Sequence, residues 1–289
     1  LSSEQARNLA GPALKNLQVA ATISGKGHIA VHPGNIQTRL DLSLADGSVF
    51  VPDSKLSLSG ISTSLSLVDL FNLRSLPGQT LTIDSVTNQK IKITNLVYNY
   101  TIENPRSFLM EKLSFDWCGG RVYSEAIRFP SQNREYQMTL YGEQIELVQF
   151  FDQLGVFKAS GKGTLNGRIP ISYTDGEIRF SNGLLFSADS GGHLSIENTD
   201  RLTAGIPVNS PQFAQLELTR EALKNFDFKW TRLKLNTEGN SLAINMELDG
   251  KPGRILPFQF SKELGGFVRV KGENSGSDFK GMKLDVNLK

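Results

Sequence analysis

Apolar and polar residues alternate along most of this chain. Leu40, Leu42 and Leu44 are separated by Asp41 and Ser43, and the same spacing recurs in segments as distant as residues 56–59 and 242–248. A period of two places neighbouring side chains on opposite faces of an extended strand. The pattern therefore predicts an all-β, mainly antiparallel fold in which each strand has one apolar and one polar face.

Tight-turn sequences separate many of these segments. Asp46-Gly47, Asn182-Gly183 and Asp249-Gly250 each lie beside an alternating run. Asp-Gly and Asn-Gly pairs accept the positive φ angles that two-residue hairpin turns require. We expect hairpin turns at these three places.

Three segments carry a helical pattern instead. They are residues 66–74 (SLVDLFNLR), residues 143–154 (EQIELVQFFDQL) and residues 210–226, which open with serine followed by proline. The apolar residues of the second segment fall on one face at helical spacing, and Ser-Pro is typical of a helix start. We therefore expect a few short helices within the β fold.

A repeated order of elements divides the chain. A helix-like segment followed by strands occurs twice, which predicts one helix-plus-meander unit over residues 60–142 and a second over residues 143–289, continuous with the first. Residues 1–59 are expected to form N-terminal strands, with a short leading helix as an option. At about 150 residues per domain, the 289 residues are ample for a buried core.

The predicted strands present more apolar surface than three short helices can cover, and such surface must be hidden from water. A closed sandwich or barrel would hide it, and the pattern alone favours the sandwich. The alternative is an elongated, curved sheet that forms a trough-like groove with an apolar interior, occupied by an apolar ligand. The apolar strand residues that would line this groove are Leu56, Leu58, Leu65, Leu67, Leu81, Ile83, Ile91, Ile93, Leu233, Leu235, Leu242, Ile244, Met246, Leu248, Phe258 and Phe260.

Composition disfavours several other functions. The 31 basic and 29 acidic residues leave a net charge of +2, which is too balanced for a nucleic-acid partner. One cysteine and three histidines give no disulfide framework and no recognisable metal site. Scattered carboxylates offer no assignable acid–base pair. We therefore expect no enzyme activity, no catalytic residue, no metal and no cofactor.

The segment GKGTLNG at residues 161–167 resembles a nucleotide-binding loop only superficially. The lysine is not followed by serine or threonine, and a strand-like segment follows in place of a helix. Glycines that relieve a bend in a strand are the better interpretation.

The ends of the chain point to a longer protein. No window approaches 18 apolar residues, so no segment is expected to span a bilayer. The sequence begins at Leu1 rather than methionine, and its first residues lack the features of a signal peptide. We interpret it as a piece whose anchor or export signal lies elsewhere.

A series of motifs resembles one family. The motifs are Gly161-x-Gly163-x-Leu165-x-Gly167-x-Ile169-Pro170, Asp175-Gly176-x-Ile178, Gly183-x-Leu185, Gly191-Gly192 and Ala222-Leu223-x-Asn225-Phe226. In spacing and order they resemble the C-terminal region of the YdbH-type family, which carries a dicarboxylate-transport label and is grouped with the AsmA-like intermembrane lipid-transport proteins. The resemblance covers residues 60–260, and the Gly- and Lys-rich last thirty residues depart from it.

The resemblance implies a role that the pattern alone does not establish. It implies a periplasmic protein of a bacterium with two membranes, anchored in the inner membrane through a missing N-terminal part. Such a protein conducts phospholipid between the inner and outer membranes through a hydrophobic β-groove, and the resemblance suggests contact with a small outer-membrane lipoprotein at the C-terminal end. The alternative interpretation is a closed β-sandwich that serves as a scaffold or interaction module of the cell envelope.

Overall fold

A computed structural model describes residues 17–89, 91–130, 135–174, 177–187, 191–197, 199–202, 207, 211–263, 265–271 and 276–288. The chain divides into two compact units. Unit 1 comprises residues 1–141 and 170–179, and unit 2 comprises residues 142–169 and 180–289. The three-segment division expected from the sequence stays a prediction, and the optional N-terminal helix falls outside the described residues.

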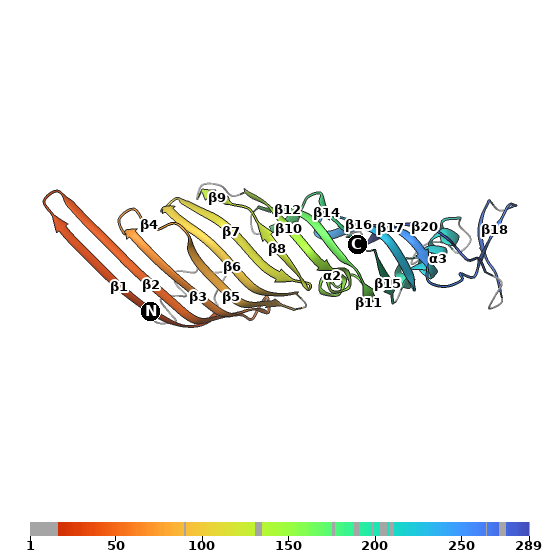
Figure 1. Ribbon diagram of the computed structural model, residues 1–289, viewed down its shortest axis with the longest axis horizontal. Helices are drawn as coiled ribbons and strands as arrows, with labels where there is room; N and C mark the ends of the chain where they lie inside the picture. The colour runs from red at the N-terminus through yellow and green to blue at the C-terminus, as the bar shows by residue number, and fades with distance from the viewer. Residues whose placement is uncertain are drawn as a thin grey trace. The chain divides into compact units, whose positions relative to one another are not determined.

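Unit 1 is built from long antiparallel strands (Figure 1). Its strands are β1 (Gln18–His32), β2 (Asn35–Val51), β3 (Leu56–Asp69), β4 (Arg74–Ser75), β5 (Gln79–Asn88), β6 (Ile91–Asn104), β7 (Ser107–Trp117), β8 (Gly120–Ser124) and β9 (Ile127–Pro130). Hydrogen-bonded pairing runs from β1 through β2, β3, β5 and β6 to β7, and β8 and β9 both pair with β7. The mainly antiparallel all-β prediction is confirmed.

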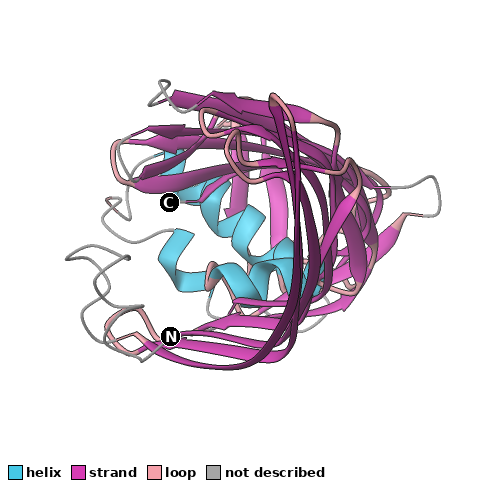
Figure 2. Cartoon of the chain, turned by 90° about the vertical axis from the view of Figure 1, so that its left-hand side faces the viewer, coloured by secondary structure: helices cyan, strands magenta, loops and turns pink. Residues whose placement is uncertain are grey.

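Three strands contribute residues to both units, namely β10 (Glu135–Glu146), β12 (Thr164–Thr174) and β13 (Glu177–Phe180). β10 pairs with both β8 and β12. Seen along its row of strands, unit 1 follows an arc that stays open on one side (Figure 2). Its described strands therefore form a curved open sheet, as the trough predicts, and not two packed layers.

Unit 2 combines a sheet with helices. Its remaining strands are β11 (Ala159–Lys162), β14 (Gly183–Ser187), β15 (Gly192–Ile196), β16 (Phe226–Glu238), β17 (Ser241–Pro252), β18 (Phe258–Ser261), β19 (Gly266–Arg269) and β20 (Met282–Leu288). β18 and β19 form a separate two-stranded sheet. The helices are α2 (Leu147–Leu154), the 3₁₀ turn η2 (Thr199–Leu202) and α3 (Pro211–Leu223). No helix in the described part of the chain is long and apolar enough to cross a membrane.

The helix predictions are right in two places and wrong in one. α3 lies within the predicted segment 210–226, and α2 fills residues 147–154 of segment 143–154, whose first four residues belong to β10. Segment 66–74 is not a helix, because β3 continues to Asp69 and a turn follows. The Asp69 carboxylate accepts hydrogen bonds from the backbone N–H groups of Phe71 and Asn72, which stabilises the turn locally.

Two predicted hairpin turns are also wrong. Asp46-Gly47 lies inside β2 and Asp249-Gly250 inside β17. Asp46 has a φ of 52°, and the register between β2 and β3 shifts beside it, so the pair forms a β-bulge. A bulge accommodates the same positive φ as a tight turn without ending the strand. Asn182-Gly183 does lie between two strands, β13 and β14.

Candidate functional site

In unit 1, residues that pair across neighbouring strands mostly have similar polarity. One rung of directly paired residues crosses six strands, and all its members are apolar: Val19, Val49, Leu58, Val86, Ile93 and Trp117. Directly paired residues project from the same face of a sheet. Unit 1 therefore has a continuous apolar face across β1, β2, β3, β5, β6 and β7.

The opposite face of unit 1 is polar. A second rung across the same strands consists of Ser24, Ser43, Ser64, Thr80, Asn99 and Lys112. Their sequence neighbours in the adjacent rung are mostly apolar, including Leu44, Leu81 and Leu113. The alternation of apolar and polar residues in the sequence therefore places apolar side chains on one face and polar side chains on the other, from β1 to β7.

No described element of unit 1 covers the apolar face. The substantial contacts of its described strands are with neighbouring strands of the same sheet. Several apolar residues near the β1 edge are largely exposed, including Ile29 at 65% and Val31 at 73%. Farther along, Leu67 and Ile83 are buried, at 7% and 8% exposure. The apolar face of unit 1 therefore ranges from exposed near β1 to buried at these two positions.

Unit 2 covers its apolar face with its own helices. The rung Leu185, Leu233, Met246 and Val286 crosses four strands and is fully or almost fully buried. The α2 side chains Leu147, Phe150 and Phe151 are equally buried, and α3 contacts β15, β17 and β19. Unit 2 therefore has an ordinary packed core.

The sixteen groove candidates fall into two environments. Eight lie on the apolar face of unit 1, on β3, β5 and β6: Leu56, Leu58, Leu65, Leu67, Leu81, Ile83, Ile91 and Ile93. Most of these are half-buried, and Ile91 is 38% exposed. The structure brings them together on one surface.

The other eight lie in unit 2, where the described residues enclose most of them. Those with at most 2% exposure are Leu233, Leu235, Ile244, Met246, Leu248 and Phe258. Leu242 is half-buried, and Phe260 is 58% exposed on the separate β18–β19 sheet. Lipid contact at these positions stays a prediction, and for the six enclosed residues it requires the covering elements to move.

The apolar face of unit 1 also contains residues that were not among the predicted groove candidates. Leu42 pairs with Leu65, and Leu40 pairs with Leu67, so both belong to the same surface. Their period of two was visible in the sequence. Six aromatic residues that contact one another in series were not predicted either, because aromatic contacts between distant strands leave no local pattern in the sequence.

These six residues form what we call the aromatic band: Tyr98, Tyr100, Phe108, Phe129, Tyr136 and Tyr173. Successive rings from Phe108 to Phe129, Tyr136 and Tyr173 have centroids 6.3, 5.1 and 6.5 Å apart. Tyr98 and Tyr100 both stack on Phe108, at 6.0 and 5.4 Å. The band therefore joins β6, β7, β9, β10 and β12 within unit 1.

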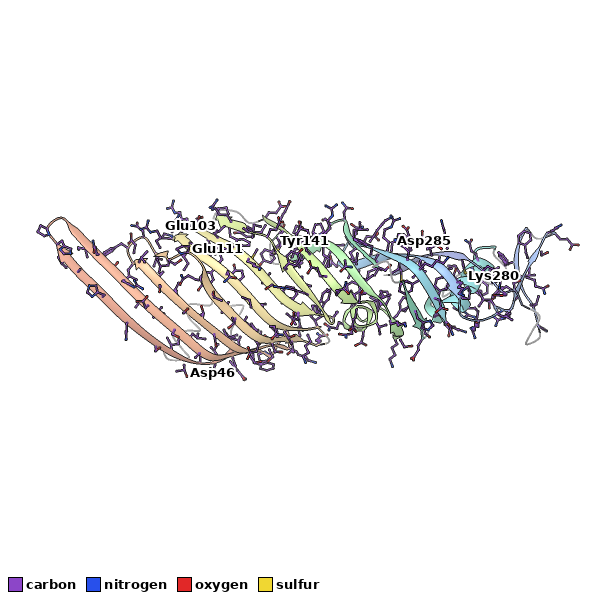
Figure 3. All side chains as sticks on the ribbon, viewed as in Figure 1. Asp46, Glu103, Glu111, Tyr141, Lys280 and Asp285 are labelled. Atoms are coloured by element: carbon purple, nitrogen blue, oxygen red, sulfur yellow. The ribbon has the colours of Figure 1, made fainter. Side chains whose placement is uncertain are left out.

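The band lies toward one edge of unit 1. It includes residues near the end of β6, the start of β7, the end of β9, the start of β10 and the end of β12. Antiparallel neighbours bring these strand ends to the same edge of the sheet. Glu103, near the end of β6, marks this edge in Figure 3, and Asp46 marks the opposite one.

The phenol groups of the band differ in their hydrogen bonding. Tyr136 donates to the Pro130 carbonyl at 3.3 Å, and the Tyr100 hydroxyl lies 3.5 Å from the Thr63 hydroxyl. Burial, with a smaller effect of Tyr100, raises the pKa of Tyr98 to about 12. The Tyr98 phenol therefore stays protonated, as a hydrogen-bond donor, at any physiological pH.

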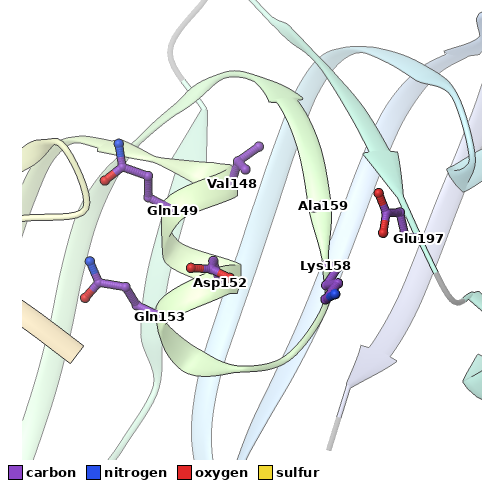
Figure 4. A pocket seen from close by; sticks show the side chains of 7 residues that line it. All are labelled: Val148, Gln149, Asp152, Gln153, Lys158, Ala159 and Glu197. Carbon is purple, nitrogen blue, oxygen red and sulfur yellow. The ribbon is translucent and has the colours of Figure 1, made fainter. Parts of the chain in front are cut away.

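A pocket of about 480 Å³ lies between α2 and β11 in unit 2 (Figure 4). Its lining mixes charges and amides, including Asp152, Lys158 and Glu197. Such a lining suits water better than an acyl chain. We assign it no ligand.

The remaining sequence candidates have structural roles. The glycines of GKGTLNG lie in and between β11 and β12, and a Cβ at Gly167 would lie 2.0 Å from the Leu184 carbonyl oxygen. They allow close strand approach, so phosphate binding is not needed to explain them. His28 and His32 are exposed on β1, and the described residues contain no group of three metal-ligating side chains.

Unit 1 thus belongs to the class of open β-sheets with a single, partly exposed apolar face and a polar reverse side. A family model described as "YdbH-like: Intermembrane phospholipid transport protein YdbH" matches residues 3–252. The chain therefore belongs to the YdbH-like family, which is a lipid-transport family and not an enzyme family. No curated protein and no solved structure matches the chain.

Proposed function

We propose that the apolar face of unit 1 shields phospholipid acyl chains while the lipid moves between the inner and outer membranes. The observation that carries this proposal is the uncovered rung from Val19 to Trp117, which is apolar across six strands. The family description, intermembrane phospholipid transport, supports the same ligand and task.

The energetic need for such a face is large. Two acyl chains of about 16 carbons lose about 25 kcal/mol on exposure to water, at about 0.8 kcal/mol per CH₂. A continuous apolar surface removes much of this cost along the path. The polar headgroup can remain in solvent at the open side of the sheet, so no fixed cationic site is required.

The wider setting is part of the same proposal. The chain is a segment of a longer periplasmic bridge of a bacterium with two membranes, anchored in the inner membrane. At the outer membrane it meets a small lipoprotein. Membership of the YdbH-like family supports the route between membranes, and the anchor and the lipoprotein are the parts of the proposal that need separate tests.

A pair of double variants tests the face directly. Leu42 and Leu65 pair on the apolar face, and Ser43 and Ser64 pair one position away on the polar face. Leu42→Glu with Leu65→Glu puts two charges where acyl chains would lie, and each charge costs about 3 kcal/mol in a hydrocarbon environment. Ser43→Glu with Ser64→Glu adds the same charges, with the same cross-strand repulsion, to the polar side.

Native mass spectrometry of the purified chain measures the outcome. Bound phospholipid should be lost from the Leu42/Leu65 double variant and retained by the Ser43/Ser64 double variant. Retention in both, or loss in both with intact circular dichroism, would contradict binding on one face.

A further inference from the structure

The aromatic band is the feature of unit 1 that acyl-chain shielding does not explain. A face that only shields hydrocarbon needs aliphatic side chains, such as the leucine, isoleucine and valine residues that β2, β3 and β5 contribute to the apolar face. At the edge where β6 ends and β7 begins, the side chains become aromatic, and four of the six carry a hydroxyl group.

The band extends from the apolar face toward solvent. Tyr100 is 9% exposed, whereas Tyr173 at the other end is 45% exposed. Tyr98 pairs with Leu81 and Leu113 of the apolar face. The rings therefore extend from the apolar face to its solvent-exposed edge, and such an arrangement suits an amphipathic ligand.

Two hydroxyls of the band are available to a ligand. Those of Tyr98 and Tyr173 make no hydrogen bond within the part of the chain that the structure describes. A nearby cation is available too. Arg106 lies in the turn at the same edge, two residues before Phe108, and its guanidinium forms no ion pair among the described residues.

We infer that the aromatic band binds the interfacial region of a phospholipid, meaning its glycerol, ester and phosphate groups, and so orients the lipid with its headgroup at the β6–β7 edge. Tyr98 and Tyr173 donate hydrogen bonds to ester or phosphate oxygens, and Arg106 attracts the phosphate. Tyrosine rings take this position at membrane surfaces, where one end of the ring is apolar and the other is wet. The inference rests on the proposed function and adds the orientation of the bound lipid.

Two photoreactive lipids test the orientation. Both are phosphatidylethanolamines with a diazirine on one acyl chain, either beside the ester or beside the terminal methyl group. Each is loaded onto the purified chain from vesicles and irradiated, and the labelled peptides are identified by mass spectrometry. The ester-proximal probe should label peptides that contain Tyr98, Phe108 and Tyr173 about fivefold more than the methyl-end probe does, since one hydrogen bond favours one orientation by about that factor.

Three outcomes are distinguishable. Preferential labelling of the band by the ester-proximal probe supports the inference. Equal labelling of the band by both probes overturns the orientation and leaves acyl-chain shielding intact. Absence of labelling with either probe overturns the proposed function, and the orientation falls with it.

Hydroxyl deletions separate binding from packing. Tyr98→Phe with Tyr173→Phe keeps both rings and breaks no described hydrogen bond, so the fold should be unchanged. Labelling of the band by the ester-proximal probe should fall about fivefold, and methyl-end labelling elsewhere should persist. Tyr141→Phe is the control, because Tyr141 stacks on Tyr123, which pairs with Ser114 away from the apolar face. Unchanged labelling in the double variant would mean that the band only packs the sheet edge.

Discussion

Leucine truncations in the two units should have very different costs. Leu233 in β16 has 0% exposure and lies in the buried rung of unit 2. Leu65 in β3 is half-buried on the apolar face of unit 1. The same Leu→Ala change therefore compares a packed core with a face that no described element covers.

The expected magnitudes follow from burial. Three carbons at about 0.8 kcal/mol each account for about 2.4 kcal/mol when the leucine is fully buried. The cavity left behind raises the total for Leu233→Ala to about 3–5 kcal/mol. Leu65→Ala should cost about 1 kcal/mol, because roughly half of that transfer energy is lost and an open face leaves no enclosed cavity.

Urea denaturation followed by tryptophan fluorescence can measure each unit separately. Trp117 lies in β7 of unit 1 and Trp230 in β16 of unit 2, so single-tryptophan versions report one unit each. A cost of about 3 kcal/mol or more for Leu65→Ala would refute the reasoning, because it would mean that the Leu65 side chain is enclosed in lipid-free protein.

Two further predictions concern unit 2. Gly167→Ala should destabilise it by several kcal/mol, because Gly167 has a φ of 153° and a Cβ would lie 2.0 Å from the Leu184 carbonyl oxygen. Gly281→Ala, in the same unit and with open space around its Cβ, is the control in the same thermal melts, and equal melting temperatures would contradict the prediction. Burial opposes ionisation of Glu221, but the hydrogen bond from Lys224 and nearby arginines outweigh it and lower the pKa of Glu221. Its ionised form therefore stabilises the fold above the unfolded-state pKa, and this contribution is lost as the pH falls through the lower folded-state pKa. Glu221→Gln should flatten the acid side of the stability–pH curve, and a parallel shift of the whole curve would count against the assignment.

Period-two patterning predicted the strands well because it is a local property. Leu40, Leu42 and Leu44 lie on one face of β2, as their spacing requires. Asn182-Gly183 lies where β13 ends and β14 begins, as the predicted turn requires. The Asp-Gly pair at Asp46 did not identify the local structure, because a positive φ angle is compatible with both a hairpin turn and a β-bulge, and the structure has a bulge inside β2.

The environment of each apolar face could not be predicted from spacing. The alternation at Leu65 and that at Met246 look alike in the sequence, yet one side chain is half-buried and the other has 0% exposure. The difference depends on helices placed by contacts between distant residues, such as Phe150 and Phe151 of α2, which are buried within unit 2. The aromatic band escaped prediction for the same reason, because its rings come from five strands.

Photocrosslinking in the full-length protein inside cells tests the central claim most directly. Ser64 and Leu65 are neighbours in β3, and their side chains project from opposite faces of unit 1. A photoreactive phenylalanine analogue at position 65 should form phospholipid adducts, and the same analogue at position 64 should form none above background. Equal labelling at the two positions, or adducts at position 64 alone, would contradict a conduit that carries lipid on one face.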